Sequence, residues 1–358
     1  MKEKLNLAII GQGRSGKDIH GVYYLSERNK YYNVKYVVDA DERRRKISED
    51  RYPGCITMAD YRDLYKYDDI DIVVNASYSE QHFDITKDLL EHKLNVLTEK
   101  PFAKTQYECE TLMLTAKKNG ITLAVFQNTQ LAPFYLDALD IVNNANKIGE
   151  VKQVSIRYNG LSRRWDWQTL QKRVAGSAYN TGPHPIAMGL GFLDFDKNTK
   201  VAFSKLDLAL TSGDAEDYVK IILTAPGKPV VDIEINSTDA YCDYNIKLQG
   251  SLGTFKNTPT SYKCKYLKPE ELPARPVIES FLQDENGNPL YCGENITRYE
   301  DEGNYDGTAF DVGTAGVYEN LYHVLTENAP LEVSCEQAAM VISVIEQSHA
   351  ENPLPVKF

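Results

Sequence analysis

The chain has 358 residues and a mass of 40.5 kDa, more than the roughly 250–300 residues that one hydrophobic core serves, so two domains are expected. Apolar residues make up 42% and charged residues 25%, and no apolar run approaches the about 18 residues of a membrane span, so we expect a soluble globular protein without a membrane partner. The net charge of −11 would repel a phosphate backbone, which argues against nucleic acid as a partner.

The six cysteines are scattered without a C-x-x-C pair, which indicates neither a zinc site nor a disulfide framework. The acidic run 214–217 lacks a neighbouring histidine or cysteine, so we interpret it as a solvated turn and expect no metal. The short apolar run 5–10 has no cleavage site after it and is interpreted as a first strand, not a signal peptide. Reduced thiols and the missing signal predict a cytoplasmic protein.

The first third of the chain alternates strand-like runs with helix-length segments. The helical segments 83–92 and 107–119 carry apolar residues at three- and four-residue spacing. The strand-like runs are 5–10, 34–38, 70–74, 95–97 and 122–125. Repeated β-α-β units require a parallel sheet covered on both faces, so an α/β fold with an N-terminal Rossmann-type doubly wound sheet is expected.

From about residue 151 the pattern changes to longer alternating strands. These runs are 151–158, 218–224, 230–235 and 245–250, with hairpin signals at 226–228 and 251–253. We therefore expect a C-terminal α/β domain with a large, mainly antiparallel open sheet, whose aromatic and aliphatic residues need a cover. The segment 267–305 predicts an irregular excursion, 336–349 a helix, and 354–358 an edge strand.

A G-x-G-x-x-G motif follows the first strand and opens the first helix, where it allows a tight turn and close backbone approach to a pyrophosphate. Asp39 ends the second strand, where a carboxylate accepts hydrogen bonds from the adenosine ribose; Asp41 fits the alternative role of a helix cap. A 2′-phosphate beside Asp39 would be repelled by about 4 kcal/mol at an effective dielectric near 20. NAD is therefore the expected cofactor, with NADP kept open by the arginines at 43–45. The motif residues are Gly11, Gln12, Gly13, Arg14, Ser15 and Gly16.

A second motif, Glu99-Lys100-Pro101, stands at the carboxyl end of the strand at 95–98. Together with the glycine motif, 75–78, His82, 176–184 and 250–255, it resembles the Gfo/Idh/MocA family of nicotinamide-dependent oxidoreductases over nearly the whole chain. The resemblance implies that Lys100 faces the nicotinamide and the substrate hydroxyl; the alternative is a solvated lysine paired with Glu99. It also implies cofactor contacts for Ala76, Ser77, His82, Glu99, Lys100 and Asn128.

The segment 176–184 is similar to the family's G-G-x-x-x-D-x-G-x-H, with Asn180 in the place of the aspartate. An amide can hydrogen-bond a substrate hydroxyl but cannot take a proton, so we assign the proton to His184, titrating near pH 6–7, with Lys100 stabilising the alkoxide or sharing the base role. A core histidine is the alternative for His184. The segment 163–167 predicts substrate contacts from Arg163 and Trp165, or else a packing loop.

We therefore expect an NAD(P)-binding Rossmann domain at 1–127 and a substrate-binding and oligomerisation α/β domain at 128–358. The predicted reaction is hydride transfer between the nicotinamide and a secondary hydroxyl of a sugar, sugar acid or cyclitol. Two alternatives remain: an NAD-assisted glycosidase or lyase that oxidises its sugar transiently, and a non-catalytic dinucleotide-binding regulator. The resemblance implies a homodimer or homotetramer through the C-terminal sheet, unless the helix at 336–349 covers that face within one chain.

Overall fold

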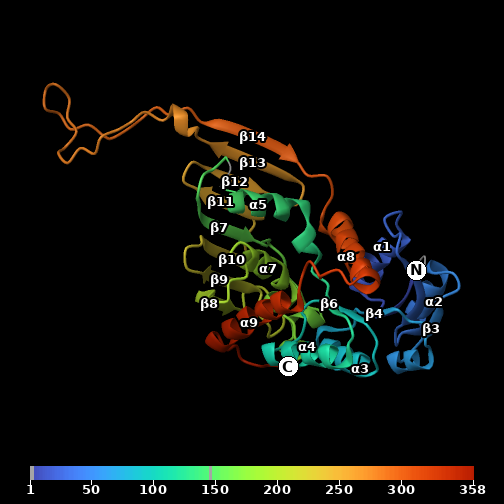
Figure 1. The fold of residues 1–358 in the computed structure, drawn as a ribbon. Helices are drawn as coiled ribbons and strands as arrows, with labels where there is room; N and C mark the ends of the chain where they lie inside the picture. Colours follow the sequence, from blue (N-terminus) through green and yellow to red (C-terminus); the bar gives the residue numbers. More distant parts are fainter. Residues whose placement is uncertain (1–3, 145–146) are drawn as a thin grey trace.

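The computed structural model describes residues 4–144 and 147–358, and this part of the chain forms two sheets with their helices (Figure 1). The N-terminal sheet is parallel, with the strand order β3-β2-β1-β4-β5-β6. Because the order changes direction between β1 and β4, this is a doubly wound sheet whose carboxyl edge is the expected ligand site. Its strands are β1 (Leu5–Ile10), β2 (Tyr32–Val38), β3 (Ile56–Met58), β4 (Ile72–Asn75), β5 (Val96–Thr98) and β6 (Leu123–Val125).

Helices cover both faces of this sheet, and its central strands are almost fully buried, as the apolar runs predicted. The predicted alternation of strand and helix is confirmed, and β3 is an addition to it. After β1 the chain forms a π-helical turn (Gly16–His20) that continues as a short helix. The helices are α1 (Gly21–Leu25), α2 (Glu42–Arg51), α3 (His82–Glu91) and α4 (Gln106–Asn119).

The C-terminal sheet has the strand order β14-β13-β12-β11-β7-β10-β9-β8 in the described residues. All neighbours are antiparallel except β7 and β10, which confirms the predicted, mainly antiparallel sheet. Both hairpin signals join neighbouring strands, β9 with β10 and β11 with β12. The strands are β7 (Val151–Arg157), β8 (Lys200–Asp207), β9 (Tyr218–Thr224), β10 (Val230–Asn236), β11 (Ile246–Gly250), β12 (Gly253–Asn257), β13 (Ser261–Tyr266) and β14 (Tyr299–Asn304).

Among the described residues, helices pack on only one face of the second sheet (Figure 1). The apolar positions of its strands, such as Val219, Ile221 and Ile233, point to that face and are fully buried. The other face is polar over much of its area, which differs from the aromatic and aliphatic face predicted from alternation. Alternation gives two sets of residues but not which set meets the helices. The helices are α5 (Pro133–Asn144), α6 (Ser177–Asn180), α7 (Pro183–Gly191) and α9 (Cys335–Glu351).

Helix α8 (Thr314–Glu327) returns to the first sheet after β14 and packs beside α1 (Figure 1). Its Tyr318 and Leu321 are buried in the same apolar cluster as the side chains of β1. Helix α9 confirms the helix predicted at 336–349 and packs against α4, α7 and β8. The edge strand predicted at 354–358 is wrong: this segment has no strand pairing, and the amide of Lys357 donates to the carboxylate of Asp214 at 2.9 Å.

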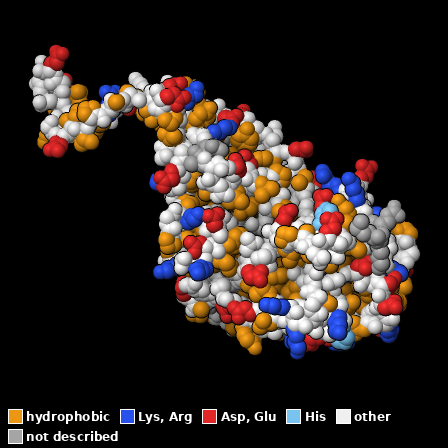
Figure 2. Space-filling model, viewed as in Figure 1, with side chains coloured by type: hydrophobic (Ala, Val, Ile, Leu, Met, Phe, Trp, Pro, Cys, Tyr) orange, Lys and Arg blue, Asp and Glu red, His pale blue; other side chains and the backbone are white. Residues whose placement is uncertain are grey.

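The segment predicted as an irregular excursion leaves the body of the molecule between β13 and β14. It contains a short 3-10 turn (Pro269–Glu271) at its root and then projects beyond the ends of the strands (Figure 1). In the space-filling view this projection, at the upper left, carries apolar side chains along its length and acidic side chains at its tip (Figure 2). We call residues 272–298 the arm.

Candidate functional site

Three loops meet at the carboxyl edge of the first sheet, because β1, β4 and β5 are parallel neighbours that end at the same edge. The glycine motif follows β1, the residues Ala76 to Tyr78 follow β4, and Glu99-Lys100-Pro101 follows β5. These sequence-predicted segments therefore lie together, as expected.

The glycine motif is packed so that two of its glycines are required and the third leaves open space. Gly11 has a φ of 89°, and a Cβ there would lie 2.3 Å from the carbonyl oxygen of Ala76. A Cβ on Gly16 would lie 1.9 Å from the oxygen of Gly11, whereas a Cβ on Gly13 would meet nothing within 4 Å. The buried Oε1 of Gln12 has no hydrogen-bond partner in the described residues. The open space at Gly13 leaves room for a dinucleotide to lie against the backbone of this loop.

Asp39 stands directly after β2 and is 8% exposed. Its Oδ2 accepts from the amide of Gln12 at 2.8 Å and its Oδ1 accepts from the amide of Asp41 at 2.8 Å. Arg44 approaches Oδ2 at 3.5 Å. Asp41 accepts from the amide of Arg43 and so caps α2, which is the alternative role predicted for it. Asp39 thus holds the glycine loop against β2 and keeps a carboxylate directly after β2, where the sequence predicts the ribose contact.

Glu99 is a buried carboxylate under the glycine loop, and three polar groups contact its two oxygens. Ser15 donates to Oε1, the ring of His20 lies 3.1 Å from the same oxygen, and the amide of Lys100 donates to Oε2 at 2.9 Å. Burial alone would raise the pKa of Glu99, but the hydrogen bond and charge of His20, with Lys100 and Ser15, hold this pKa at about 2. Tyr318 from α8 reaches the other ring nitrogen of His20 at 2.7 Å. Sequence reasoning missed this network, since no local pattern links residues so far apart.

Lys100 crosses from the first sheet to the second domain. Its Nζ donates to the backbone oxygen of Asn180 at 2.7 Å. Burial lowers the pKa of Lys100; Glu99 opposes this, and the nearby charges of Arg14 and Arg164 lower the pKa further. The alternative of a solvated surface lysine therefore does not fit, because the side chain is partly buried and bonded across two domains.

Asn180 ends α6 and presents a fixed amide. Its Oδ1 accepts from Nε2 of Gln168 at 2.7 Å, so within the described residues its amide nitrogen is left as the free group. That amide can donate a hydrogen bond to a substrate oxygen. Gln168 is a site residue that the sequence did not indicate, and no motif marked it.

His184 lies near the start of α7, with its Nδ1 3.0 Å from the hydroxyl of Thr129. Burial, with a contribution from the charge of Lys100, lowers the pKa of His184 to about 3. The sequence expectation of titration near pH 6–7 is therefore not met, because that expectation used the value of a solvated imidazole. The ring is neutral at physiological pH. Thr129 was not indicated by the sequence.

Two residues predicted to contact the cofactor use their polar atoms within the protein instead. His82 is 2% exposed, and its ring nitrogens lie 2.7 Å from the oxygen of Pro101 and 3.2 Å from that of Ser77. Asn128 is 3% exposed and donates to the oxygen of Ala309 at 2.9 Å. Both residues hold the loops of the site in place. Ala76 and Ser77 lie at the end of β4, beside the glycine loop.

Only part of the segment 163–167 lies against the site. Trp165 is 80% exposed, and the exposed Arg163 donates to the hydroxyl of Ser212 at 2.8 Å. Trp167 instead meets Tyr78 edge to face at 5.0 Å, and the guanidinium of Arg173 lies 4.7 Å from the ring centre of Tyr78. The structure thus places Trp167, not Trp165, against a loop of the cofactor edge.

The acidic run at 214–217 is not the solvated turn that the sequence predicted. Asp214, Glu216 and Asp217 are all buried. Oε1 of Glu216 accepts from the amide of Ala178 at 2.9 Å, and Oε2 lies 3.2 Å from the ring of His349 in α9. The prediction was wrong because backbone amides and a distant histidine satisfy these carboxylates. Glu216 thereby anchors the segment that carries Asn180.

Metal-binding clusters and membrane-spanning helices are absent from the part of the chain that the structure describes. The described residues contain no cluster of three or more histidines, cysteines, aspartates or glutamates, and no helix among them is long and apolar enough to cross a membrane.

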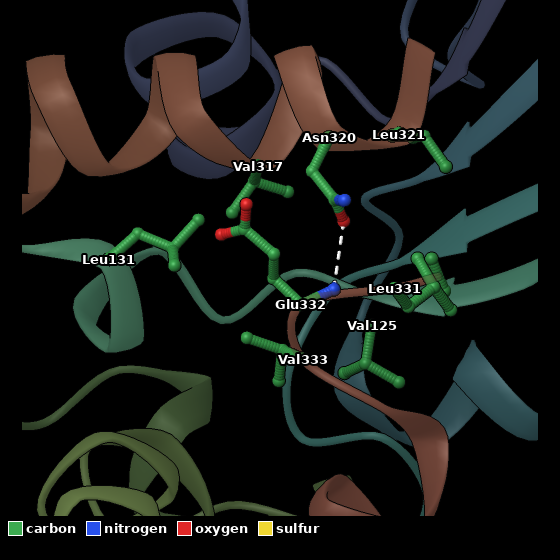
Figure 3. A pocket seen from close by; sticks show the side chains of 9 residues that line it. Val125, Leu131, Val317, Asn320, Leu321, Leu331, Glu332 and Val333 are labelled. Carbon is green, nitrogen blue, oxygen red and sulfur yellow. Dashed lines mark hydrogen bonds between the residues drawn. The ribbon is translucent and has the colours of Figure 1, made fainter. Parts of the chain in front are cut away.

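A small cavity between α8 and the loop before α9 has a volume of about 10 Å³ (Figure 3). It is lined mainly by apolar side chains such as Val125, Leu131 and Val317, and it holds no more than about one water.

Comparisons with known proteins cover most of the chain. The model of an oxidoreductase family with an NAD-binding Rossmann fold, GFO_IDH_MocA, matches residues 5–127, and the model of the family's C-terminal alpha/beta domain matches residues 144–357. The uncharacterized oxidoreductase YhhX of Escherichia coli K12 is 24% identical over 96% of this chain and 95% of its own. Inositol 2-dehydrogenase 2 of Saccharopolyspora erythraea is 25% identical over 93% of this chain and 97% of its own.

Two solved structures show the same fold. The crystal structure of the probable oxidoreductase YhhX superposes with a TM-score of 0.76 at 17% identity and covers 98% of both chains. The structure of GenD2 from gentamicin A biosynthesis, in complex with NAD, has a TM-score of 0.75 at 17% identity and covers 98% of this chain and 95% of its own.

Proposed function

Because the chain belongs to the Gfo/Idh/MocA oxidoreductase family, with its NAD-binding Rossmann fold, we propose that it is an NAD-dependent dehydrogenase acting on a secondary hydroxyl. The substrate class is a sugar, sugar acid or cyclitol, and the inositol dehydrogenases among its relatives support the cyclitol in particular. The observation that carries the proposal is the bond from Lys100 to the oxygen of Asn180, which joins the cofactor edge to the second domain.

The residues at the edge fit NAD. The backbone of Gly11 to Gly16 lies where the pyrophosphate would approach, and Asp39 has a carboxylate at the ribose position. When bound, NAD supplies the hydride acceptor. NADP remains open because Arg44 partly balances the charge of Asp39. Ala76, Ser77 and Glu99 complete the loops around this edge.

Lys100 is the base that we propose for the substrate hydroxyl. A proton acceptor works best when its pKa lies near the working pH, and burial moves the pKa of Lys100 downward toward it. His184, with a pKa of about 3, is a weak acceptor, so its neutral ring positions the substrate oxygen instead. The amide nitrogen of Asn180 donates to the same substrate. This assignment moves the proton from His184, where the sequence placed it, to Lys100.

Substrate contacts are proposed for Arg163 and Trp165, whose exposed side chains would order on a bound sugar ring. Tyr78 and Trp167 supply a second aromatic surface beside the cofactor edge. A cytoplasmic location is proposed on the six free cysteines, which suit a reducing compartment. A homodimer or homotetramer is proposed through the open face of the C-terminal sheet.

The decisive experiment is a panel of sugars, sugar acids and inositols incubated with NAD or NADP, with NADH or NADPH followed by absorbance. We expect stoichiometric NADH from at least one member of the panel and a loss of roughly 10²–10⁴ in kcat for Lys100→Ala. Lys104→Ala, an exposed lysine four residues away, is the matched control and should keep full activity. Binding of NAD without any turnover would favour the regulator, and cleavage of a glycoside without net NADH would favour the lyase; either result overturns the dehydrogenase.

A further inference from the structure

The arm, residues 272–298, is a preformed element and not a formless loop. Its two legs are joined by an ion pair between Arg275 and Glu294 and by the amide of Leu290, which donates to the oxygen of Leu282 at 2.8 Å. At the tip, Oδ1 of Asp284 accepts from the amides of Asn286 and Asn288 at 2.8 and 2.9 Å. Within the described part of the chain, the hydrogen-bond partners of the arm lie in the arm itself or in the turn at its root.

Large apolar side chains on the arm have no cover. Val277, Phe281 and Tyr291 are 93%, 92% and 102% exposed, and Ile278 and Leu290 are each 54% exposed. A soluble protein rarely exposes such a group of residues unless the group is a contact surface. Aromatic residues are also the commonest energetic centres of protein interfaces. The arm therefore has the composition of a contact element.

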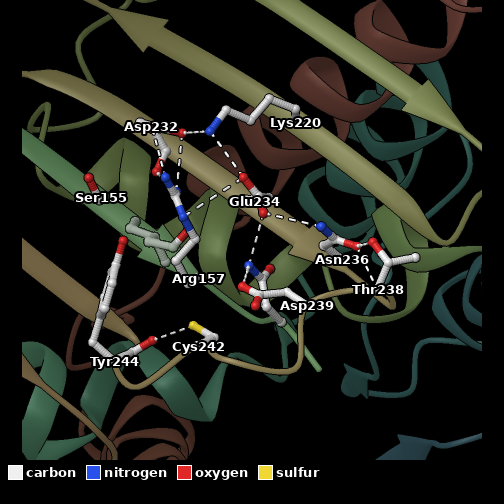
Figure 4. Close-up of polar contacts among 12 residues, drawn as sticks. Ser155, Arg157, Lys220, Asp232, Glu234, Asn236, Thr238, Asp239, Cys242 and Tyr244 are labelled. Atoms are coloured by element: carbon white, nitrogen blue, oxygen red, sulfur yellow. Dashed lines mark hydrogen bonds and ion pairs between the residues drawn. The ribbon is translucent and has the colours of Figure 1, made fainter. Parts of the chain in front are cut away.

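The open face of the C-terminal sheet is a surface that can accept it. Arg157 lies 2.8 Å from Asp232, and Lys220 pairs with both Asp232 and Glu234, so these four charges at the centre of the face are already paired within the chain (Figure 4). These four side chains are only 13–20% exposed. A face with paired charges can be covered without leaving an uncompensated charge.

Apolar residues gather at one end of that open face. Phe203 is paired with Ile222 in the register of β8 and β9, and Val230, at the start of β10, lies on the same face beyond β9. Phe203 is 50% exposed and Val230 42%. This end lies at β8, at the opposite edge of the sheet from β13 and β14, where the arm is rooted.

We propose that the arm docks on the open sheet face of a second copy of this chain, with Phe281 and Tyr291 meeting the apolar end around Phe203. Both complementary surfaces are on this chain. A twofold axis parallel to the strands, between two stacked sheets, would place the β14 edge of each copy, where the arm is rooted, over the β8 edge of its partner. Two equal contacts would then form. The leg 272–283 can reach about 40 Å at ~3.3 Å per residue, whereas in this arrangement it has to cross only the roughly 10 Å between two stacked sheets. This proposal rests on the proposed sheet dimer and is independent of the dehydrogenase reaction.

Light scattering after size exclusion tests the arm. The full chain should have a mass that is a multiple of 40.5 kDa, and Phe281→Asp or Tyr291→Asp should each raise the dimer dissociation constant about 30-fold or more, the effect of one interface residue worth about 2 kcal/mol. Tyr107→Asp, at a 76% exposed aromatic on α4, is the control and should leave the mass unchanged. A monomeric full chain overturns the sheet dimer and the arm together. An oligomer unaffected by both arm substitutions overturns the arm alone.

Cys292 gives a second test, because it is exposed and stands next to Tyr291 on the arm. In a Phe203→Cys variant, oxidised glutathione should join the new thiol to Cys292 of the other copy, with two thiols oxidised and the glutathione disulfide reduced. A dimer on a non-reducing gel that disappears with Cys292→Ser is the expected result. A Tyr107→Cys variant should give no such product. Failure of the Phe203→Cys variant to cross-link, while the chain still elutes as an oligomer, overturns the docking at β8.

Discussion

We expect the segment 176–184, which carries Asn180, to be held in place mainly by Glu216. Its carboxylate is fully buried, and its two oxygens hold the amide of Ala178 and the ring of His349. Its backbone oxygen also accepts from the amide of Ser177 at 2.8 Å. Helix α6, which carries Asn180, is therefore fixed at its start by one residue from the loop before β9.

Glu216→Ala should lower the free energy of unfolding by about 3–5 kcal/mol, the usual loss when one partner of a buried pair is removed. Glu216→Gln keeps the shape and one acceptor but not the charge, so a smaller loss of about 1.5–3 kcal/mol is expected. Urea unfolding measures the free-energy loss of both variants. The kcat obtained from initial rates shows whether α6 has moved. A loss below about 1 kcal/mol for Glu216→Ala would contradict the assigned contacts.

The same pair predicts a pH dependence. Burial would lower the pKa of His349, but the hydrogen bond and charge of Glu216 raise it above its ordinary value of 6.5. Protonated His349 therefore contributes stability that is fully present below pH 6.5 and is lost as the pH rises through the raised pKa of the folded state. His349→Gln should remove this decline. An identical decline in that variant would assign it to another group.

Three further substitutions test the site. Asp39→Ala should weaken NADH binding more than NADPH binding in a fluorescence titration, since only the ribose hydroxyls lose an acceptor; equal weakening would contradict the ribose assignment. His184→Asn should lower kcat without changing the pH at which the rate rises, because a pKa of about 3 lies below the assayed range; a flattened rise would return the base role to His184. Asn180→Asp places a carboxylate beside Lys100, which should raise the pKa of Lys100 and move the rise of the pH–rate profile to higher pH; an unmoved profile would exclude Lys100 as the titrating group.

The sequence predicts the two sheets because their signals are local. Strands such as β1 and β9 are predicted from the apolar pattern of consecutive residues. A glycine motif directly after a strand predicts a dinucleotide-binding turn in the same local way. Helix α9 follows in the same way from its apolar spacing, and the structure confirms it. The boundary after residue 127, by contrast, stays a prediction.

Features that depend on distant partners escape local reasoning. The acidic run at 214–217 has the composition of a solvated turn, and only the fold shows that His349 and the chain near Lys357 satisfy it. The pKa of His184 is another case, since the residues next to it in the sequence do not indicate that the fold buries its ring. His82 and Asn128 matched the family's positions, and the structure shows their polar atoms already engaged.

The properties of Lys100 come from both domains at once, and this links its chemistry to the position of α6. Burial is the largest cause of its lowered pKa, and part of that burial is the second domain, where its Nζ meets Asn180 and where Arg164 adds a like charge. Glu99, in the first domain, acts in the opposite direction. If α6 moves away, the desolvation of Lys100 decreases while Glu99 stays, so its pKa rises toward the ordinary value of a lysine. Glu216→Ala should therefore shift the rise of the pH–rate profile to higher pH as well as lowering stability, whereas a purely structural weakening would lower kcat at every pH by the same factor.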